Sequence, residues 1–474
     1  MGLHQRPPAH AVSGPMSEIV SLHLGMPPST FPWPLEGSNA TMINEDSLRA
    51  FAAARGRDDR VHPRRTPYNF AGIPSLVGAS LGLELELAPT LPEAALGPLP
   101  RRYDRVITLL VDGLGWTSFE AAGAALPFFR RFVERGVCSQ LSAQFPSTTA
   151  AHVTTLHTGE PVERSGVFEW VYYEPQLERL FLPLVYASVE GSETAPLAAA
   201  PEPNPLFPAR TFYTLLAEHG RSSACLQRDR YVDSPFSRSV CRGARRVGYA
   251  DVPEVARRLA EATRSSKDPS PDYACLYLDD LDGAGHRHGP GSPEHTEVLG
   301  HIASALESEL LPALARSKAR TLVLVTADHG QLRVDPERTI YLDQLLPQCR
   351  EWMRRDGRGR PLRPGGSPRD LFLYVEEHRV DEALGALQAA LDGRAEVLRT
   401  SELVARGVFG PRPSPRLLER LGEIAVLPAH RGDAGEMIGW WGEGEGQQHK
   451  RGHHGGLASA EMAIPLLAMA FGRD

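Results

Sequence analysis

The chain has 474 residues, a formal net charge of −7 and hydrophobic residues at 42% of its positions. This length allows a large buried core, either in more than one domain or in one domain with big insertions. The charge balance excludes a polyanion partner as the default, so we expect no binding to a nucleic-acid polymer. A small phosphate-bearing ligand remains compatible with it.

The cysteines and the lengths of the apolar runs indicate the cellular compartment in which the protein is expected. Five scattered cysteines form no CxxC pair, which argues against a disulfide framework or a cysteine zinc site and favours a reducing compartment. We find no apolar run of about 18 residues and no signal-peptide pattern at the N-terminus. We therefore expect a cytoplasmic protein without a membrane partner.

The first segment of the chain is rich in proline and arginine. Residues 1–65 include PPSTFPWPLEG, and we expect an N-terminal extension that is poorly ordered or straps the surface. From residue 105 the pattern sharpens into apolar runs. Residues 105–113, 273–280 and 320–328 are each apolar on both faces and each end in an acid, as strands of a parallel sheet covered by helices do.

Helical patterns alternate with these strands. One helix is expected to start at Asp251 and Pro253, and another to span residues 294–317. The alternation predicts an α/β fold with a doubly wound, mostly parallel sheet. Residues 336–439 read as an inserted α/β cap subdomain with a strand at 370–377 and a helix carrying Leu387. Residues 66–335 and 440–474 then form the core.

Acids and histidines gather where the predicted strands end. Asp112 and Asp328 end the first and last runs, and Asp282 belongs to the acidic cluster after the middle one. In open α/β sheets, function collects at the carboxyl ends of the strands. The histidines in question are His286 in the expected loop DGAGHRHGP, His329 beside Asp328, and His453 or His454 in RGHHGGL. Carboxylate and imidazole ligands without thiolate suit zinc, with manganese as the harder alternative.

A hydroxyl nucleophile is available in FPSTTAAH, residues 145–152. A helix pattern begins after Ser147, and a Thr at a helix N-terminus lies where the helix dipole favours a phosphate. Either Thr148 or Thr149 fits on these grounds, although both are also ordinary helix-capping residues. Two metal ions about 4 Å apart can clamp the attacking and leaving oxygens of a phosphoryl transfer.

Five short motifs, in order, resemble the alkaline phosphatase superfamily in its type I phosphodiesterase/nucleotide pyrophosphatase branch. They are VDGLG (111–115), FPSTTAAH (145–152), DGAGHRHGP (282–290), ADHG (327–330) and GHHGG (452–456). The resemblance implies Thr149 as nucleophile and Asp112, Thr149, Asp328 and His329 around a first metal ion. It implies Asp282, His286 and His454 around a second. The implied chemistry is a phosphothreonine intermediate that water hydrolyses.

Some positions depart from that family pattern and leave the substrate open. Ala150 and Ala151 follow the nucleophile where Phe-Pro is common, and Glu169 and Trp170 stand near the position of a phosphate-binding Asn. A small phosphoester, possibly a nucleotide, is the expected substrate. The alternatives are a phosphonate hydrolase or phosphomutase of the same superfamily, and a non-catalytic metal-binding module.

Several residues near the motifs have plainer interpretations. His288 is expected at the surface, and Asp279 and Asp280 as solvated groups or neighbours of the ligands. The aromatic residues Phe168, Trp170, Tyr172 and Tyr173 are expected to pack in the core, with a stacking wall for a base as the less favoured role. Arg358, Arg360 and Arg363 are expected in a solvated loop, with a phosphate-steering rim as the less favoured role.

Overall fold

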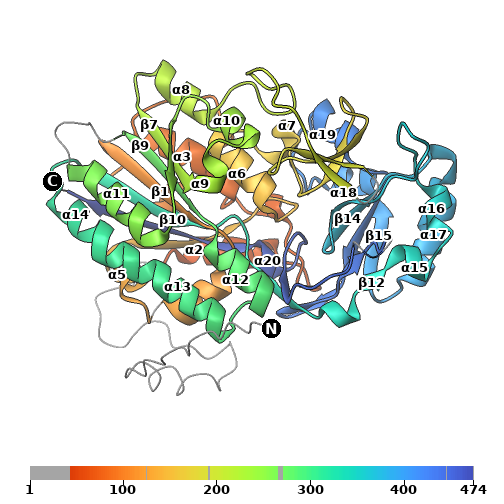
Figure 1. The fold of residues 1–474 in the computed structure, drawn as a ribbon. Coiled ribbons are helices and arrows are strands. Elements are labelled where there is room, and N and C mark those ends of the chain that lie inside the picture. Colours follow the sequence, from red (N-terminus) through yellow and green to blue (C-terminus); the bar gives the residue numbers. More distant parts are fainter. Residues whose placement is uncertain are drawn as a thin grey trace, which may run out of the picture. The chain divides into compact units, whose positions relative to one another are not determined.

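The three apolar runs lie side by side in one seven-stranded sheet of the computed structural model (Figure 1). The structure describes residues 43–123, 125–190, 193–264, 271–442, 444 and 446–472. In order across the sheet, the strands are β2 (Val137–Ser142), β21 (Ala463–Phe471), β10 (Thr321–Thr326), β1 (Arg105–Val111), β9 (Tyr273–Leu278), β7 (Ser223–Arg228) and β8 (Arg245–Tyr249). Only β21 runs antiparallel to its neighbours. The predicted α/β fold with a mostly parallel sheet is confirmed.

Helices cover both faces of this sheet (Figure 1). One layer contains α5 (Pro127–Arg135), α11 (Val252–Arg264), α13 (Pro293–Ala305) and α14 (Leu311–Arg316). The other contains α3 (Ile73–Ser80), α6 (Thr149–Thr158), α8 (Phe212–Glu218) and α10 (Pro235–Val240). Strand β10 is therefore buried along its whole length, which explains why its sequence is apolar at every position rather than at alternate ones. The helix expected at 294–317 is interrupted by a π-helical turn, η5 (Leu306–Leu310).

The register of the central strands sets the position of the acids. Leu110 pairs with Thr326 of β10, and Val111 pairs with Leu278 of β9. The residues that follow these strands therefore emerge at one edge of the sheet. Asp112 and Asp328 come from neighbouring strands, which parallel pairing alone brings together.

The segment predicted as the loop DGAGHRHGP is instead the helix α12 (Asp280–His288), so that expectation was wrong. Its two glycines are unfavourable in a helix, and this made the loop plausible from sequence. The helix places Asp282 and His286 four residues apart, which puts both side chains on one face. Helix geometry thus brings Asp282 and His286 together, as sheet register brings Asp112 and Asp328 together.

The inserted segment forms a second sheet, on the right in Figure 1. Its strands are β13 (Gly365–Ser367), β14 (Asp370–Leu373), β16 (Ile424–Pro428) and β15 (Ala395–Arg399), paired antiparallel in that order. The helix α17 (Val380–Ala390) packs on it, and Trp352, Leu387 and Val426 belong to an apolar cluster of its own. The short helices α15 (Leu342–Leu345), α16 (Cys349–Trp352), α18 (Thr400–Arg406) and α19 (Pro415–Arg420) and the pair β12 (Ile340–Tyr341) and β19 (Ile438–Gly439) complete the segment.

Two smaller sheets flank the predicted site. A meander follows α6 and α7 (Val162–Ser165) and contains β3 (Tyr172–Glu174), β4 (Arg179–Leu182), β5 (Ala187–Glu190) and β6 (Glu193–Pro196). The other sheet contains β17 (His430–Arg431), β18 (Ala434–Gly435), β11 (Leu332–Val334) and β20 (Gly452–His453). In it Leu332 pairs with His453, so the segments ADHGQ and GHHGG meet through backbone pairing.

The end of the predicted extension packs on the core. Helix α2 (Glu45–Ala54) contacts edge strand β2, where Ser47 Oγ accepts a hydrogen bond from Gln140 N at 2.9 Å. Residues 1–42 of the expected extension lie outside the described residues, and the division into extension, core and cap stays a prediction. Within the described part of the chain, none of the helices combines the length and apolar character that crossing a bilayer requires.

A buried ion pair ties the insertion to the GHHGG segment. Arg369, in the β13–β14 turn, donates to the Glu461 carboxylate at 3.0 and 3.1 Å, and both side chains are buried. The same carboxylate accepts from the backbone N–H groups of Gly456 and Ala458. Glu461 lies in helix α20 (Ser459–Met462) and anchors this loop through these hydrogen bonds.

Replacing Glu461 with glutamine is expected to lower the free energy of unfolding by about 3–5 kcal/mol, because it leaves a buried guanidinium without its counter-charge. Chemical denaturation measures this. The control is Glu307→Gln, whose partner Arg131 is largely exposed, and it should cost less than about 1 kcal/mol. Equal losses of unfolding free energy in the two variants would show that the buried Arg369–Glu461 pair stabilises the protein no more than the exposed pair does.

Candidate metal and nucleophile site

The first predicted ligand set comes together at the carboxyl edge of the sheet. His329 Nε2 lies 3.4 Å from Asp112 Oδ1 and 3.3 Å from Asp328 Oδ2. All three side chains are buried, and one donor atom from each lies within 4.8 Å of the other two. Two oxygens and one imidazole nitrogen converging at this spacing match the donor set of a zinc or manganese site.

The hydrogen bonds of the two carboxylates leave one oxygen of each directed at this cluster. Asp328 Oδ1 accepts from the backbone N–H groups of Gly113 and His329, and Asp112 Oδ2 accepts from the Tyr277 hydroxyl at 2.5 Å. Asp112 Oδ1 and Asp328 Oδ2 are buried and have no hydrogen-bond partner among the described residues. Buried polar atoms without partners are costly, and a bound cation would satisfy both. The residues present therefore fit the metal that the family resemblance implies.

The charge of this cluster leads to the same conclusion. Burial, together with the neighbouring charges of Asp328 and Asp282, raises the pKa of Asp112 well above its usual value. Acids packed this closely resist ionisation because each disfavours the charge of the next. A divalent cation would relieve that repulsion.

The second predicted set lies beside the first. Asp282 Oδ2 is 3.3 Å from His286 Nε2, and Asp282 Oδ1 is 3.7 Å from His454 Nε2. The three-donor group at this side contains Asp282, His454 and His329, with His286 bordering it through Asp282. Nε2 of His286 is 3.1 Å from the Lys450 ammonium, which engages it instead.

The three predicted ligand histidines share one orientation. Nδ1 of His286 lies 2.7 Å from Gly452 O, Nδ1 of His329 lies 3.0 Å from Gly330 O, and Nδ1 of His454 lies 3.0 Å from Ser147 O. A carbonyl partner requires the proton on Nδ1, which leaves the lone pair of Nε2 free to bind a metal ion in each ring. Burial lowers the pKa of His454 well below its usual value, and the nearby imidazolium charges of His329 and His286 would lower it further. The neutral ring that a metal ion needs is thus the favoured form.

The two donor groups are adjacent. The rings of His329 and His454 stack with centroids 3.5 Å apart and planes 12° apart. Thr149 Oγ1 lies 3.1 Å from His329 Nε2 and 3.5 Å from Asp112 Oδ2. The structure therefore brings the predicted nucleophile into the first donor group.

Helix α6 presents Thr149 and separates it from Thr148. Thr148 is the N-cap, but its hydroxyl donates to Phe168 O at 3.0 Å and does not cap the helix. Thr149 is the first helical residue and is only partly buried. The N-terminal N–H groups of α6 thus lack a capping side chain at the point where Thr149 faces the donors, and such a terminus favours an anion.

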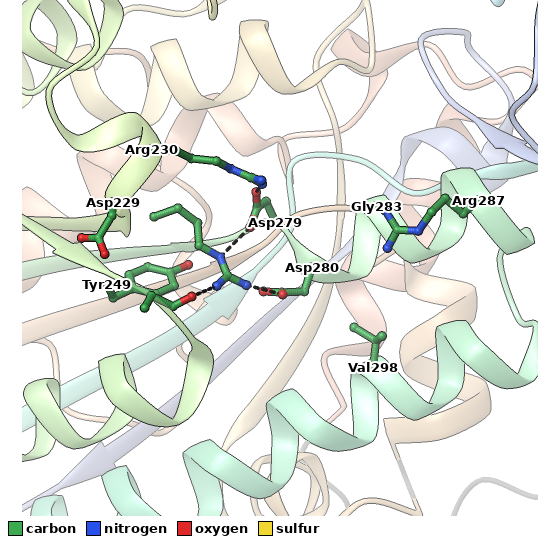
Figure 2. A pocket seen from close by; sticks show the side chains of 10 residues that line it. Asp229, Arg230, Tyr249, Asp279, Asp280, Gly283, Arg287 and Val298 are labelled. Atoms are coloured by element: carbon green, nitrogen blue, oxygen red, sulfur yellow. Dashed lines mark hydrogen bonds and ion pairs between the residues drawn. The ribbon is translucent and has the colours of Figure 1, made fainter. Parts of the chain in front are cut away.

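The neighbouring acids and histidines have other partners. Arg228 bonds Asp279 at 3.2 Å and also pairs with Asp280, and Tyr231 donates to Asp279 at 2.9 Å. Both acids line a pocket of about 520 Å³, together with Tyr249 of β8 and Arg287 of α12 (Figure 2). His288 is exposed beside Glu294. His453 is buried, with Nδ1 bonded to its own backbone neighbours.

The aromatic stretch after α6 divides between core and surface. Phe168 and Tyr172 are buried and stack on each other, as the packing interpretation predicts, whereas Trp170 is 47% exposed. Glu169 between them is fully buried, and its carboxyl lies against that of Asp370. Burial raises the pKa of Glu169 to about 8, so this acid is protonated at neutral pH in the folded protein.

Replacing Glu169 with glutamine is expected to stabilise the protein increasingly as the pH rises from about 5 to about 8. The folded pKa lies above the unfolded value, so the wild-type contribution is complete below pH 4 and is lost as the pH rises through 8. Glutamine needs no proton, and its side-chain oxygen can still accept the hydrogen bond from the Asp370 carboxyl. The gap in unfolding free energy should grow by at most about 1.4 kcal/mol per pH unit. Thermal melts across this range measure it, and a gap that does not change with pH would contradict the raised pKa.

Three contacts at the site were missed from the sequence. Tyr277 holds Asp112, Gln331 Nε2 donates to Asp282 Oδ1 at 2.5 Å, and Lys450 reaches His286. Gln331 directly follows ADHG, and this adjacency was the available signal.

A further group lies away from this site: Cys225 and Cys241, 3.2 Å apart at sulfur, approach His157. All five cysteines are buried free thiols.

Comparison with models of known protein families shows to which family this chain belongs. A model described as type I phosphodiesterase/nucleotide pyrophosphatase matches residues 106–457. The chain belongs to this family. The matched range includes every residue predicted for the metal and nucleophile site, from Asp112 to His454.

Curated relatives in the phosphodiesterase family share low sequence identity with this chain, and the matches cover a minor part of their length. Mouse ectonucleotide pyrophosphatase/phosphodiesterase family member 3 is 23% identical over 284 residues, which cover 58% of this chain and 30% of that protein. Bovine bis(5'-adenosyl)-triphosphatase is 28% identical over 107 residues, 21% of this chain and 23% of that protein. The match thus spans less than a third of the length of these relatives.

Solved structures confirm the alkaline-phosphatase-like fold. Mouse ectonucleotide pyrophosphatase/phosphodiesterase 5, as an inactive variant with AMP, superimposes with a TM-score of 0.57 and 18% identity, covering 78% of this chain and 88% of that one. Phosphonoacetate hydrolase from Sinorhizobium meliloti, with phosphonoformate, gives a TM-score of 0.54 and 18% identity, covering 79% and 92%.

Proposed function

We propose that this phosphodiesterase-family chain is a metal-dependent hydrolase of phosphate esters, of the phosphodiesterase/nucleotide pyrophosphatase type. The observation that carries the proposal is the position of Thr149 Oγ1, 3.1 Å from His329 Nε2, at the uncapped start of α6 and beside two buried carboxylate oxygens without partners. A hydroxyl, a cation-binding donor set and an anion-favouring helix terminus meet there.

The ligand sets proposed from the sequence remain Asp112, Thr149, Asp328 and His329 for one metal ion and Asp282, His286 and His454 for the other. Two divalent ions, with zinc favoured and manganese as the alternative, would lower the pKa of the Thr149 hydroxyl and offset charge on the phosphoryl oxygens. Tyr277 and Gln331 orient Asp112 and Asp282, and the three carbonyls bonded to Nδ1 orient the histidines.

Thr149 performs the covalent step. Its Oγ forms a bond to phosphorus while the bond from phosphorus to the leaving oxygen breaks, and the hydroxyl proton leaves toward Asp112 Oδ2, which lies 3.5 Å from Thr149 Oγ1. Water then attacks the phosphothreonine, releasing phosphate or a phosphomonoester and restoring the hydroxyl. The N–H groups at the start of α6 are placed to hold phosphoryl oxygens during both steps.

A nucleotide is the proposed substrate class, because the curated relatives are named for nucleotide pyrophosphatase and dinucleoside triphosphatase activity. A phosphonate hydrolase is the second candidate. It is favoured by Trp170 at the position near which nucleotide-cleaving members carry an Asn, together with the structural similarity to phosphonoacetate hydrolase. The cytoplasmic location also stays a proposal, with which the five free thiols agree.

An assay panel on metal-reconstituted protein tests the proposal. The substrates are p-nitrophenyl phosphate, bis(p-nitrophenyl) phosphate, ATP and phosphonoacetate, each with and without a chelator. We expect chelator-sensitive turnover of at least one ester. Turnover of phosphonoacetate alone would select the second candidate. Two bound metal ions without turnover of any substrate would favour the non-catalytic module.

A further inference from the structure

Lys450 is an unusual residue in this chain. Lysine and arginine together number 51, and only Lys267, Lys318 and Lys450 are lysines. Lys450 is partly buried, precedes strand β20 by two residues, and places its ammonium 3.1 Å from His286 Nε2. That nitrogen is the ring atom left free when Nδ1 bonds Gly452 O.

The surroundings of this ammonium belong to the site. Burial lowers the pKa of this ammonium, and the nearby carboxyl groups of Asp282, Glu169 and Asp112 oppose that shift, in decreasing order. Two of these are predicted metal ligands, and the third comes from the stretch that departs from the family pattern. Lysine carries a compact point charge on a flexible stem, whereas arginine would bring a planar fork. The head group can therefore move from His286 to an anion bound among these residues.

We propose that Lys450 binds a negatively charged oxygen of the substrate, so that the site favours phosphates with a second negative charge over singly charged diesters. The inference rests on the proposed function. The substrate class it selects is phosphate monoesters and nucleoside polyphosphates. A lysine ammonium stabilises a dianion more than a monoanion at the same distance, and partial burial reduces the screening of this difference by water.

The competing interpretation is that Lys450 only fills the place of the second metal ion. Both interpretations account for the contact between Lys450 and His286 Nε2, because a bound metal ion would need the same nitrogen. They differ in what happens when the amine is removed. If Lys450 binds substrate, removing its amine should weaken anion binding and leave the metal content unchanged. If Lys450 only occupies the place of the metal ion, removing its amine should raise the metal affinity and leave anion binding unchanged.

The test compares Lys450→Met with Arg451→Met, which removes an exposed neighbouring cation. Both are assayed with p-nitrophenyl phosphate, a dianion at pH 8, and bis(p-nitrophenyl) phosphate, a monoanion with the same leaving group. For Lys450→Met we expect kcat/KM for the monoester to fall about 10- to 100-fold and that for the diester less than about 3-fold. The control should change neither by more than about 2-fold.

Two further readouts are independent of turnover. Calorimetric titration with inorganic phosphate should show weaker binding to metal-loaded Lys450→Met by about the same factor, and elemental analysis should show unchanged metal content. Equal losses on both esters, unchanged phosphate affinity, or increased metal loading would each overturn the role of Lys450. If the wild type hydrolyses neither ester, the proposed function fails, and phosphate titration still decides whether Lys450 binds anions.

Discussion

Replacing Thr149 with alanine is expected to lower kcat by about 10⁴-fold or more, because the variant has no oxygen to form the phosphothreonine. Thr149 Oγ1 touches His329 Nε2 and Asp112 Oδ2, whereas the backbone of α6 does not depend on this hydroxyl. The unfolding free energy should therefore stay close to that of the wild type, and the remaining donors Asp112, Asp328 and His329 should retain the first metal ion. Steady-state kinetics with p-nitrophenyl substrates and elemental analysis measure these quantities.

The control for Thr149 is Thr148→Val. Thr148 bonds Phe168 O and points away from the donor groups, so the variant should keep kcat within about 10-fold of the wild type. Acid quenching during turnover should trap phosphothreonine in the wild type and in Thr148→Val but not in Thr149→Ala. A trapped phosphate in Thr149→Ala, or full loss of activity in Thr148→Val alone, would assign the nucleophile to Thr148.

Replacing Asp328 with asparagine is expected to have opposite effects on stability with and without metal. In chelated protein the variant should be more stable than the wild type by about 1–3 kcal/mol, because one charge leaves a buried cluster in which Asp328 raises the pKa of Asp112. Asparagine Oδ1 can still accept from Gly113 N and His329 N.

With metal present the order should reverse. The wild type gains about 2.7 kcal/mol when free metal is 100-fold above its Kd, whereas Asp328→Asn loses most of this gain. Activity should fall at least about 10²-fold. Thermal melts of both proteins, with and without zinc, measure the crossover, and exposed Asp433→Asn serves as control. A wild type that zinc does not stabilise would count against the metal site.

The sequence predicted the site best where the chemistry is local to a motif. Asp328 and His329 are adjacent, Asp112 ends an apolar run, and a break at Pro146 precedes the nucleophile helix. The prediction was weaker where a side chain works through a distant partner. Tyr277 lies inside a strand that reads as core, and Lys450 stands between glycine-rich and histidine-rich stretches, so neither belongs to a motif. For Lys450 the one signal in the sequence is the scarcity of lysine in the chain.

The glycines of DGAGHRHGP explain the wrong loop expectation. In isolation they disfavour helix, but in the fold Gly113 and Gln331 pack closely against α12, near Asp282 and Gly285. Any Cβ at Gly285 would collide with the Gln331 side chain. Gly285 thus leaves room for the Gln331 side chain beside α12, and at this position tertiary packing overrides local propensity.

The order of apolar and polar segments by itself determined the α/β class, the strands that end in acids and the types of donor available, because burial on both faces of a parallel sheet leaves a continuous apolar pattern. Only the tertiary structure decided which of these donor side chains lie next to one another. Parallel pairing of β1 with β10 aligns Asp112 with Asp328, and the pairing of β11 with β20 carries His454 onto His329. Such register depends on contacts between residues more than 100 positions apart, which no local pattern encodes.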